Sequence, residues 1–93
     1  MIVVLARIKT QAGSEARFEA LASALVQASR QEPGMAGYTL LKQGDGLYCF
    51  LEQYRDEDAV EAHRKTEHFR SIGREMGACM DGKPTVERFQ VLA

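Results

Sequence analysis

The stretch Gly37–Tyr54, GYTLLKQGDGLYCFLEQY, decides the fold because it predicts a β-hairpin. Its two ends, Gly37–Gln43 and Leu47–Tyr54, are rich in aromatic and aliphatic residues that favour strands. Between them stands Gly44-Asp45-Gly46, and an Asp-Gly step between two apolar runs is a strong hairpin signal. We therefore expect two adjacent antiparallel strands in this stretch.

The residues before the hairpin predict a strand followed by a helix. Ile2–Lys9 is rich in β-branched residues and has the length of a strand. Ser14 is a candidate helix N-cap, and apolar residues then recur at helical spacing up to about Arg30. Glu32-Pro33-Gly34 ends this helix, because proline cannot continue the hydrogen-bond ladder and glycine adopts backbone angles that other residues avoid.

The residues after the hairpin predict further helix and a last strand. Asp56 is a candidate cap for a helix, and Thr66 is a candidate cap for its continuation. Gly82-Lys83-Pro84 ends the helix, and Thr85–Leu92 alternates as a strand. The order strand, helix, strand, strand, helix, strand is that of the ferredoxin-like fold, an α+β architecture with an antiparallel sheet.

Length and charge limit the classes of function. The 93 residues predict a single domain, residues 1–93, because a second core would need roughly 50 to 100 residues more. A net charge of -1 offers no concentrated positive charge, so we expect no nucleic-acid partner. The apolar run in Met1–Lys9 is too short for a signal peptide or a membrane span. We therefore expect a cytoplasmic protein with no membrane partner.

The strand Leu47–Tyr54 carries apolar residues on both of its faces. Successive side chains point to opposite sides, so one side has Leu47, Cys49 and Leu51, and the other has Tyr48, Phe50, Glu52 and Tyr54. Two helices can cover only one face of the sheet, so we expect the second face to pack on another copy in a two-fold homodimer. The alternative is a monomer with exposed aromatic side chains.

Short motifs are spread along nearly the whole chain. They are Glu32–Tyr38 (EPGMAGY), Phe50–Asp56 (FLEQYRD), Ala62-His63, Thr66–Phe69 (TEHF) and the turn formed by Asp81, Gly82 and Pro84. Together they resemble the antibiotic biosynthesis monooxygenase (ABM) family, in its small single-domain quinol monooxygenase type. The resemblance implies a dimeric α+β barrel, in which two ferredoxin-like sheets pack together and each subunit holds a substrate cavity between sheet and helices.

The resemblance also implies an activity. The family includes oxygenases that act on polycyclic phenols and quinols without a metal or a flavin. An electron-rich phenolate can itself pass an electron to O₂, so the protein has to bind it, favour its deprotonated form and exclude water. We therefore expect a cofactor-independent monooxygenase that oxidises a small aromatic quinol or phenol with O₂.

The chain departs from the family pattern at one position. Tyr54 stands where the family usually has tryptophan, and the sequence contains neither tryptophan nor asparagine. This argues against haem degradation and against the mechanism of the polyketide oxygenases that use those residues. Two other functions stay open: an isomerase or lyase acting on a small enolisable carbonyl compound, and a non-catalytic ligand-binding dimer.

Three side chains are candidate catalytic groups: His68, His63 and Glu52. An imidazole with a pKa of about 6.5 can take a phenolic proton near neutral pH. Glu52 stands in an apolar row, where burial would raise its pKa and suit it to acid or base chemistry. Each has a structural alternative, namely a helix-start hydrogen bond for His68, a hydrogen bond under the sheet for His63, and an ion pair with Arg7 or Arg88 for Glu52.

No metal site is expected from the two histidines. Five residues at about 100° each place His63 and His68 about 140° apart around a helix, so their rings face apart unless the helix breaks between them. We therefore expect neither a metal nor another cofactor.

Five aromatic side chains are candidate substrate contacts: Tyr38, Tyr48, Phe50, Tyr54 and Phe69. A tyrosine can donate a hydrogen bond to a substrate oxygen while its ring stacks on the substrate. The alternative is that the tyrosines fill the dimer interface. Arg64 and its charged neighbours are spaced for helical pairs with glutamates, so we expect them on a solvated face.

Overall fold

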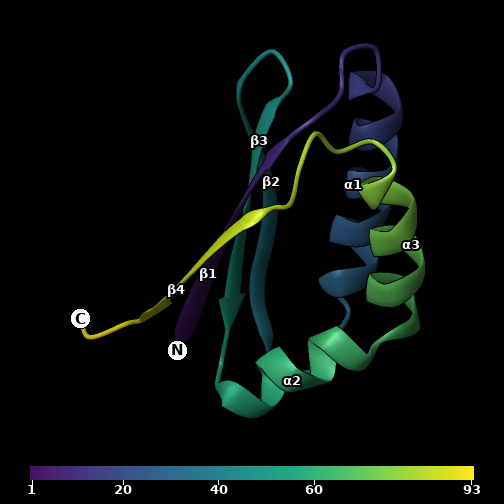
Figure 1. Ribbon diagram of the computed structural model, residues 1–93. Coiled ribbons are helices and arrows are strands. Elements are labelled where there is room, and N and C mark those ends of the chain that lie inside the picture. Colours follow the sequence, from purple (N-terminus) through teal and green to yellow (C-terminus); the bar gives the residue numbers. More distant parts are fainter.

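The computed structural model describes all 93 residues and confirms the predicted order of elements (Figure 1). The strands are β1 (Ile2–Lys9), β2 (Met35–Gly44), β3 (Leu47–Tyr54) and β4 (Thr85–Gln90). The helices are α1 (Glu15–Ser29), α2 (Glu57–Lys65) and α3 (Glu67–Gly77). The prediction of an α+β, ferredoxin-like fold is therefore correct. None of these helices has the length and apolarity needed to cross a membrane.

One face of a four-stranded antiparallel sheet is covered by the helices. The strand order is β2-β3-β1-β4, so β1 pairs with both β3 and β4. Cross-strand neighbours such as Val4 and Glu52, or Ala6 and Phe50, share one face. All three helices lie on this side of the sheet, with α2 at the end where β3 finishes (Figure 1). The aromatic row of β3 is therefore buried between sheet and helices.

The opposite face of the sheet, which we call the far face, has no helix over it (Figure 1). The strand registers place Val3, Leu5, Leu41, Leu51 and Phe89 on this face. Leu41 is 45% exposed and Phe89 is 47% exposed. The far face is thus an apolar surface that a single chain leaves uncovered, as the two-sided strand pattern predicts.

The turn at Glu32-Pro33-Gly34 packs tightly on the start of α2. Gly34 has a φ of 83°, in the left-handed region that favours glycine. A Cβ atom added there would lie 2.8 Å from the Cβ of Ala59. The carbonyl of Gly34 also accepts a hydrogen bond from the amide of Arg55 at 2.9 Å. This close packing fixes the position of Glu32 relative to α2.

A break at Thr66 separates α2 from α3. Thr66 has extended backbone angles, with φ -68° and ψ 150°. Its hydroxyl donates to the carbonyl of His63 at 2.8 Å and accepts from the amide of Phe69 at 3.2 Å. The same side chain therefore ends one helix and begins the next, and it changes the direction in which the residues after it point.

Candidate active site

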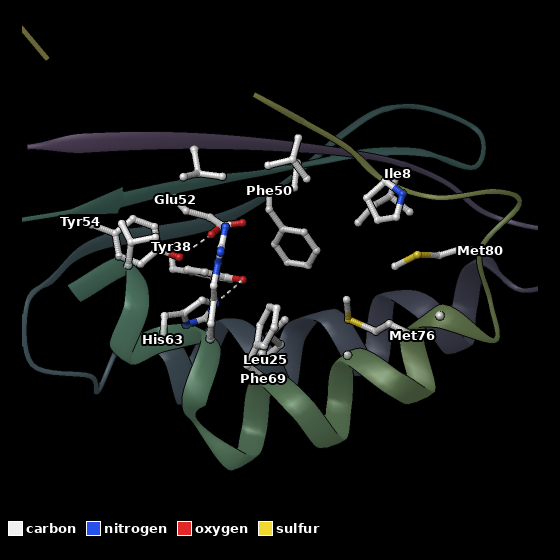
Figure 2. Close-up of a pocket in the computed structure, with 18 residues that line it drawn as sticks. Ile8, Leu25, Tyr38, Phe50, Glu52, Tyr54, His63, Phe69, Met76 and Met80 are labelled. Carbon is white, nitrogen blue, oxygen red and sulfur yellow. Dashed lines mark hydrogen bonds between the residues drawn. The ribbon is translucent and has the colours of Figure 1, made fainter. Parts of the chain in front are cut away.

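A cavity of about 360 Å³ lies between the sheet and the helices (Figure 2). Twelve of its eighteen lining residues are hydrophobic, so most of its wall is apolar. Figure 2 shows Glu52, Tyr54, Tyr38 and His63 gathered at one end, with Met76 and Met80 at the other. We call the first group the polar end. The cavity thus combines an apolar body with a small set of hydrogen-bonding groups, which is typical of small-molecule sites.

Six of the eight residues predicted from the sequence line this cavity. They are Glu52, His63, Tyr38, Phe50, Tyr54 and Phe69. β2 and β3 bring four of them from the sheet, and α2 and α3 bring His63 and Phe69 from the opposite wall. The two that do not line the cavity are Tyr48 and His68.

Tyr48 lies outside the cavity, which corrects the expectation that it contacts substrate there. Its ring packs on Phe18 of α1 with ring centroids 4.7 Å apart, and its hydroxyl donates to Glu19 at 2.5 Å. Tyr48 is 3% exposed, and burial together with the neighbouring Glu19 raises its pKa to about 12. Tyr48 therefore stabilises the packing of α1 on the sheet.

Glu52 is a buried carboxyl group at the polar end, only 8% exposed. It accepts a hydrogen bond from the Tyr54 hydroxyl. Burial raises the pKa of Glu52 to about 7, although the Tyr54 bond and the charge of Arg64 act in the opposite direction. The predicted ion pair with Arg7 or Arg88 is absent, because these arginines pair with Glu87 and Glu57 instead. A carboxyl group that titrates near neutral pH can act as acid or base.

Tyr38 and Tyr54 present neutral hydroxyl groups to the cavity. Burial and the nearby charges of Glu52 and Glu32 raise the pKa of both tyrosines well above the usual value. Each hydroxyl already has a protein partner, since that of Tyr54 donates to Glu52 and that of Tyr38 lies 3.4 Å from His63 Nε2. Both tyrosines therefore orient the ionisable groups of the polar end.

His63 is the imidazole that faces the cavity. It is 2% exposed and packs against the rings of Tyr38, Tyr54 and Phe69, with centroids 5.2, 5.7 and 4.8 Å away. Its Nδ1 lies 2.8 Å from Glu32 Oε2. Burial lowers the pKa of His63, while Glu32 acts in the opposite direction. His63 is therefore a neutral ring near pH 7, with one nitrogen toward the cavity and one toward Glu32.

His68 stands beside His63 but outside the cavity. Its Nε2 lies 2.6 Å from the same Oε2 of Glu32, and a quarter of its side chain is exposed. The two histidines were predicted to face apart unless the helix breaks between them. The helix does break at Thr66, and the ring centroids of the two histidines are 6.3 Å apart. Glu32 was predicted only as part of a turn, and no sequence pattern indicated its contact with both rings.

Glu32, His63 and His68 are also the residues whose donor atoms could surround a metal ion, since these atoms lie within 4.8 Å of one another. A tetrahedral metal with bonds of about 2.0–2.1 Å would hold its ligand atoms about 3.3 Å apart. The two contacts to Glu32 Oε2 are shorter, 2.8 and 2.6 Å, and both meet at one oxygen. This arrangement fits hydrogen bonding better than coordination.

Arg64 is exposed, as predicted for a solvated face, and it also lines the cavity. Its charge lowers the pKa of Glu52, opposing the effect of burial. Leu25, Val60 and Met76 were likewise not predicted as lining residues, although they form part of the apolar wall. Their helical spacing indicated only that they are buried, and the same pattern serves both a filled core and a cavity wall.

Residues 1–75 match the family model described as "Antibiotic biosynthesis monooxygenase". The chain is 36% identical over 74 residues to the "Putative monooxygenase YcnE" of Bacillus subtilis (strain 168), which covers 77% of this chain and 78% of that protein. Among solved structures, a "putative antibiotic biosynthesis monooxygenase" from Caulobacter crescentus CB15 is 35% identical with a TM-score of 0.85, covering 99% of this chain and 90% of the other. A Nitrosomonas europaea protein of the same description has a TM-score of 0.96 at 17% identity over the full length of both chains, which shows the shared fold. These matches show that this protein belongs to the antibiotic biosynthesis monooxygenase family.

Proposed function

We propose that this protein is a monooxygenase that oxidises a small aromatic quinol or phenol with O₂ and needs no cofactor. Membership of the family and the name of the Bacillus subtilis relative support a monooxygenase-type activity. The observation that carries the finer proposal is the cavity, in which a carboxyl group with a pKa near 7 stands at one end of an apolar, aromatic-lined space.

The cavity has the properties that such a reaction requires. Its volume of about 360 Å³ is at the lower end of the usual range for small-molecule sites, roughly 300–1,000 Å³, and suits a small ring system. Phe50 and Phe69 offer aromatic surface for the ring, and the polar end offers partners for its hydroxyl groups. The apolar wall excludes water, which protects a reactive phenolate and its radical from side reactions.

The overall reaction balances without an added reductant. A hydroquinone and O₂ give a hydroxyquinone and one water molecule, because one oxygen atom enters the ring and the other leaves with two hydrogens. The electrons come from the quinol itself. Loss of a hydroxyl proton makes the ring a stronger electron donor toward O₂, and Glu52 in its ionised form is placed to accept that proton.

A homodimer forms part of this proposal. The far face exposes apolar side chains from all four strands, and isolated chains rarely leave so large an apolar surface in water. A two-fold arrangement would cover the far face of each chain with that of the other. The cavity lies on the opposite side of the sheet, so each subunit would keep its own site (Figure 1).

Oxygen uptake tests the proposed activity. The purified protein is mixed with a panel of benzene- and naphthalene-derived quinols, and O₂ consumption and the hydroxylated product are measured. We expect turnover above the uncatalysed rate and a loss of roughly 10²-fold in kcat in Glu52→Gln. Glu57→Gln, which changes a carboxylate outside the cavity, is the matched control and should keep full activity.

Repeating the experiment without O₂ distinguishes the two other functions, an isomerase or lyase and a ligand-binding protein. Conversion of an enolisable carbonyl compound in the absence of O₂, with no O₂ consumption on any quinol, would show an isomerase or lyase. Binding of quinols without conversion of any compound would show a ligand-binding protein.

A further inference from the structure

Glu32 joins the cavity to a second imidazole outside it. Its Oε2 lies 2.8 Å from Nδ1 of His63, which faces the cavity, and 2.6 Å from Nε2 of His68, which does not. Only 9% of the Glu32 side chain is exposed, against 3% for His63 and 25% for His68. A nearly buried carboxylate therefore stands between a buried ring and a partly exposed one.

The positions of the hydrogens follow from these contacts. An ionised carboxylate can only accept hydrogen bonds, so each of the two contacts has to hold an N–H hydrogen of a histidine. His63 then carries its hydrogen on Nδ1, and its Nε2 carries a lone pair that can accept a hydrogen bond or a proton. That Nε2 lies 3.4 Å from the Tyr38 hydroxyl at the polar end of the cavity. In this tautomer the atom of His63 that meets the cavity is a proton acceptor.

His68 gives Glu32 a second hydrogen-bond partner. Glu32 receives one bond from His63 and a second, shorter one from His68, and both end at the same oxygen, Oε2. A nearly buried polar group whose hydrogen bonds are satisfied is held in one orientation. Removing His68 would therefore leave the carboxylate freer to turn away from Nδ1 of His63.

We propose that Glu32 and His68 are positioning residues for His63, which acts as a second base of the active site. Glu32 holds the Nδ1–H tautomer, so that Nε2 accepts the proton of a substrate hydroxyl, and the hydrogen bond from His68 holds the Glu32 carboxylate in position. This inference rests on the proposed function, because it supplies an acceptor for the second of the two quinol protons. The first proton goes to Glu52, and both return to the oxygen atom that leaves as water.

The surroundings of His63 agree with this role. Burial disfavours protonation of His63 most strongly, Glu32 favours it, and His68 and Arg64 disfavour it to a smaller extent. Tyr38, Tyr54 and Phe69 pack against the ring and carry no charge. The ionised form of Glu52 adds a negative charge to the same polar end. Glu32 is therefore the partner that stabilises the imidazolium when His63 has taken a proton.

Nitrogen NMR of the imidazole rings tests the tautomer without any substrate. The chain has two histidines, so His68→Gln leaves the signals of His63 alone. We expect the Nδ1–H tautomer of His63 in the wild type and in His68→Gln, because the glutamine amide can still donate to Glu32. In Glu32→Gln, which removes the charge, the pKa of His63 should fall further, because Glu32 is the group that raises it. An Nε2–H tautomer in the wild type, or an unchanged pKa in Glu32→Gln, would overturn the proposal.

Kinetics test the consequence for catalysis. In Glu32→Gln we expect kcat to fall roughly 10²-fold with little change in KM, since Glu32 does not line the cavity. His68→Leu, which cannot donate to Glu32, should lose part of the activity, and His68→Gln should restore it. Equal activity in His68→Leu and the wild type would contradict the role of His68. Thermal unfolding of each variant shows whether it is folded. If Glu32→Gln does not fold, the tautomer of His63 measured by NMR in the wild type still tests the proposal.

Two further outcomes distinguish failure of the proposed function from failure of the positioning role of Glu32 and His68. The expected tautomer without O₂ uptake on any quinol would contradict the proposed function but support the positioning of His63. Tight binding of Zn²⁺ through both histidines, seen as a change in both sets of ring signals on titration, would show a metal site and overturn the positioning role.

Discussion

Gly34 touches Ala59 so closely that no side chain fits between them. A Cβ atom at Gly34 would lie 2.8 Å from the Cβ of Ala59, and the φ of Gly34 is 83°. This contact joins the turn that carries Glu32 to the helix that carries His63. The 2.8 Å contact between Glu32 Oε2 and His63 Nδ1 depends on this packing of Gly34 against Ala59.

We expect Gly34→Ala to destabilise the fold by about 2–4 kcal/mol, from the strained φ together with the clash. Gly13→Ala is the matched control, since Gly13 has a φ of 85° but nothing within 4 Å of an added Cβ. It should lose only the backbone part, about 1–2 kcal/mol. Urea unfolding of both variants measures the difference, and equal losses would show that the contact with Ala59 contributes nothing.

Glu52→Gln should change the pH dependence of stability. Because burial raises the pKa of Glu52 from 4.5 to about 7, the native state keeps a proton in this window that the unfolded chain has lost. Wild-type stability from this group therefore falls as pH rises from about 4.5 to 7 and is constant above that range. Glutamine does not titrate. The free energy of unfolding of Glu52→Gln should therefore equal that of the wild type near pH 4 and exceed it at pH 8 by up to about 3 kcal/mol. Urea unfolding at both pH values tests this, and a variant that is less stable than the wild type at pH 8 would contradict it.

The activity should have the opposite dependence on the same group. The ionised form of Glu52 is the base, so the rate should rise through about pH 7 and level off above it. A rate profile in kcat/KM from pH 5 to 9, with correction for the uncatalysed oxidation of the quinol, measures the midpoint. A value of kcat/KM that does not change with pH would show that Glu52 is not the base.

Tyr54→Phe and Tyr48→Phe form a matched pair. Each tyrosine hydroxyl donates to one glutamate, Glu52 inside the cavity and Glu19 outside it. We expect Tyr54→Phe to lower kcat roughly 10-fold and raise the pKa of Glu52, because one donor to its ionised form is lost. Tyr48→Phe should retain the wild-type rate. A loss of rate in Tyr48→Phe as large as in Tyr54→Phe would indicate a general effect on the fold.

A charge on the far face should dissociate the proposed dimer. Leu51→Glu places a carboxylate at the centre of this face, whereas Ala24→Glu changes an exposed position on α1. We expect light scattering to give twice 10.4 kDa for the wild type and Ala24→Glu, and 10.4 kDa for Leu51→Glu. A wild-type mass of 10.4 kDa at micromolar concentration would contradict the homodimer.

Much of the fold and part of the site could be predicted because local patterns determine them. The Asp-Gly hairpin and the period-two alternation of β3 place Phe50, Glu52 and Tyr54 on one face, and the structure confirms this. Tyr48 has the same period but stands under α1, away from the cavity. Alternation decides the face on which a side chain lies but not its position along the sheet.

The sequence by itself determined the order of the elements and the burial of the β3 row, since each depends on residues near one another in the chain. Motifs along nearly the whole chain indicated the family. Only the tertiary structure decided that Glu32, His63 and His68 meet. Their contact requires the Gly34–Ala59 packing and the break at Thr66, which together bring a turn, a helix end and a helix start to one point. Helical periodicity separates the two rings only along an unbroken axis, and the direction of the chain after the break at Thr66 depends on packing that the sequence pattern does not specify.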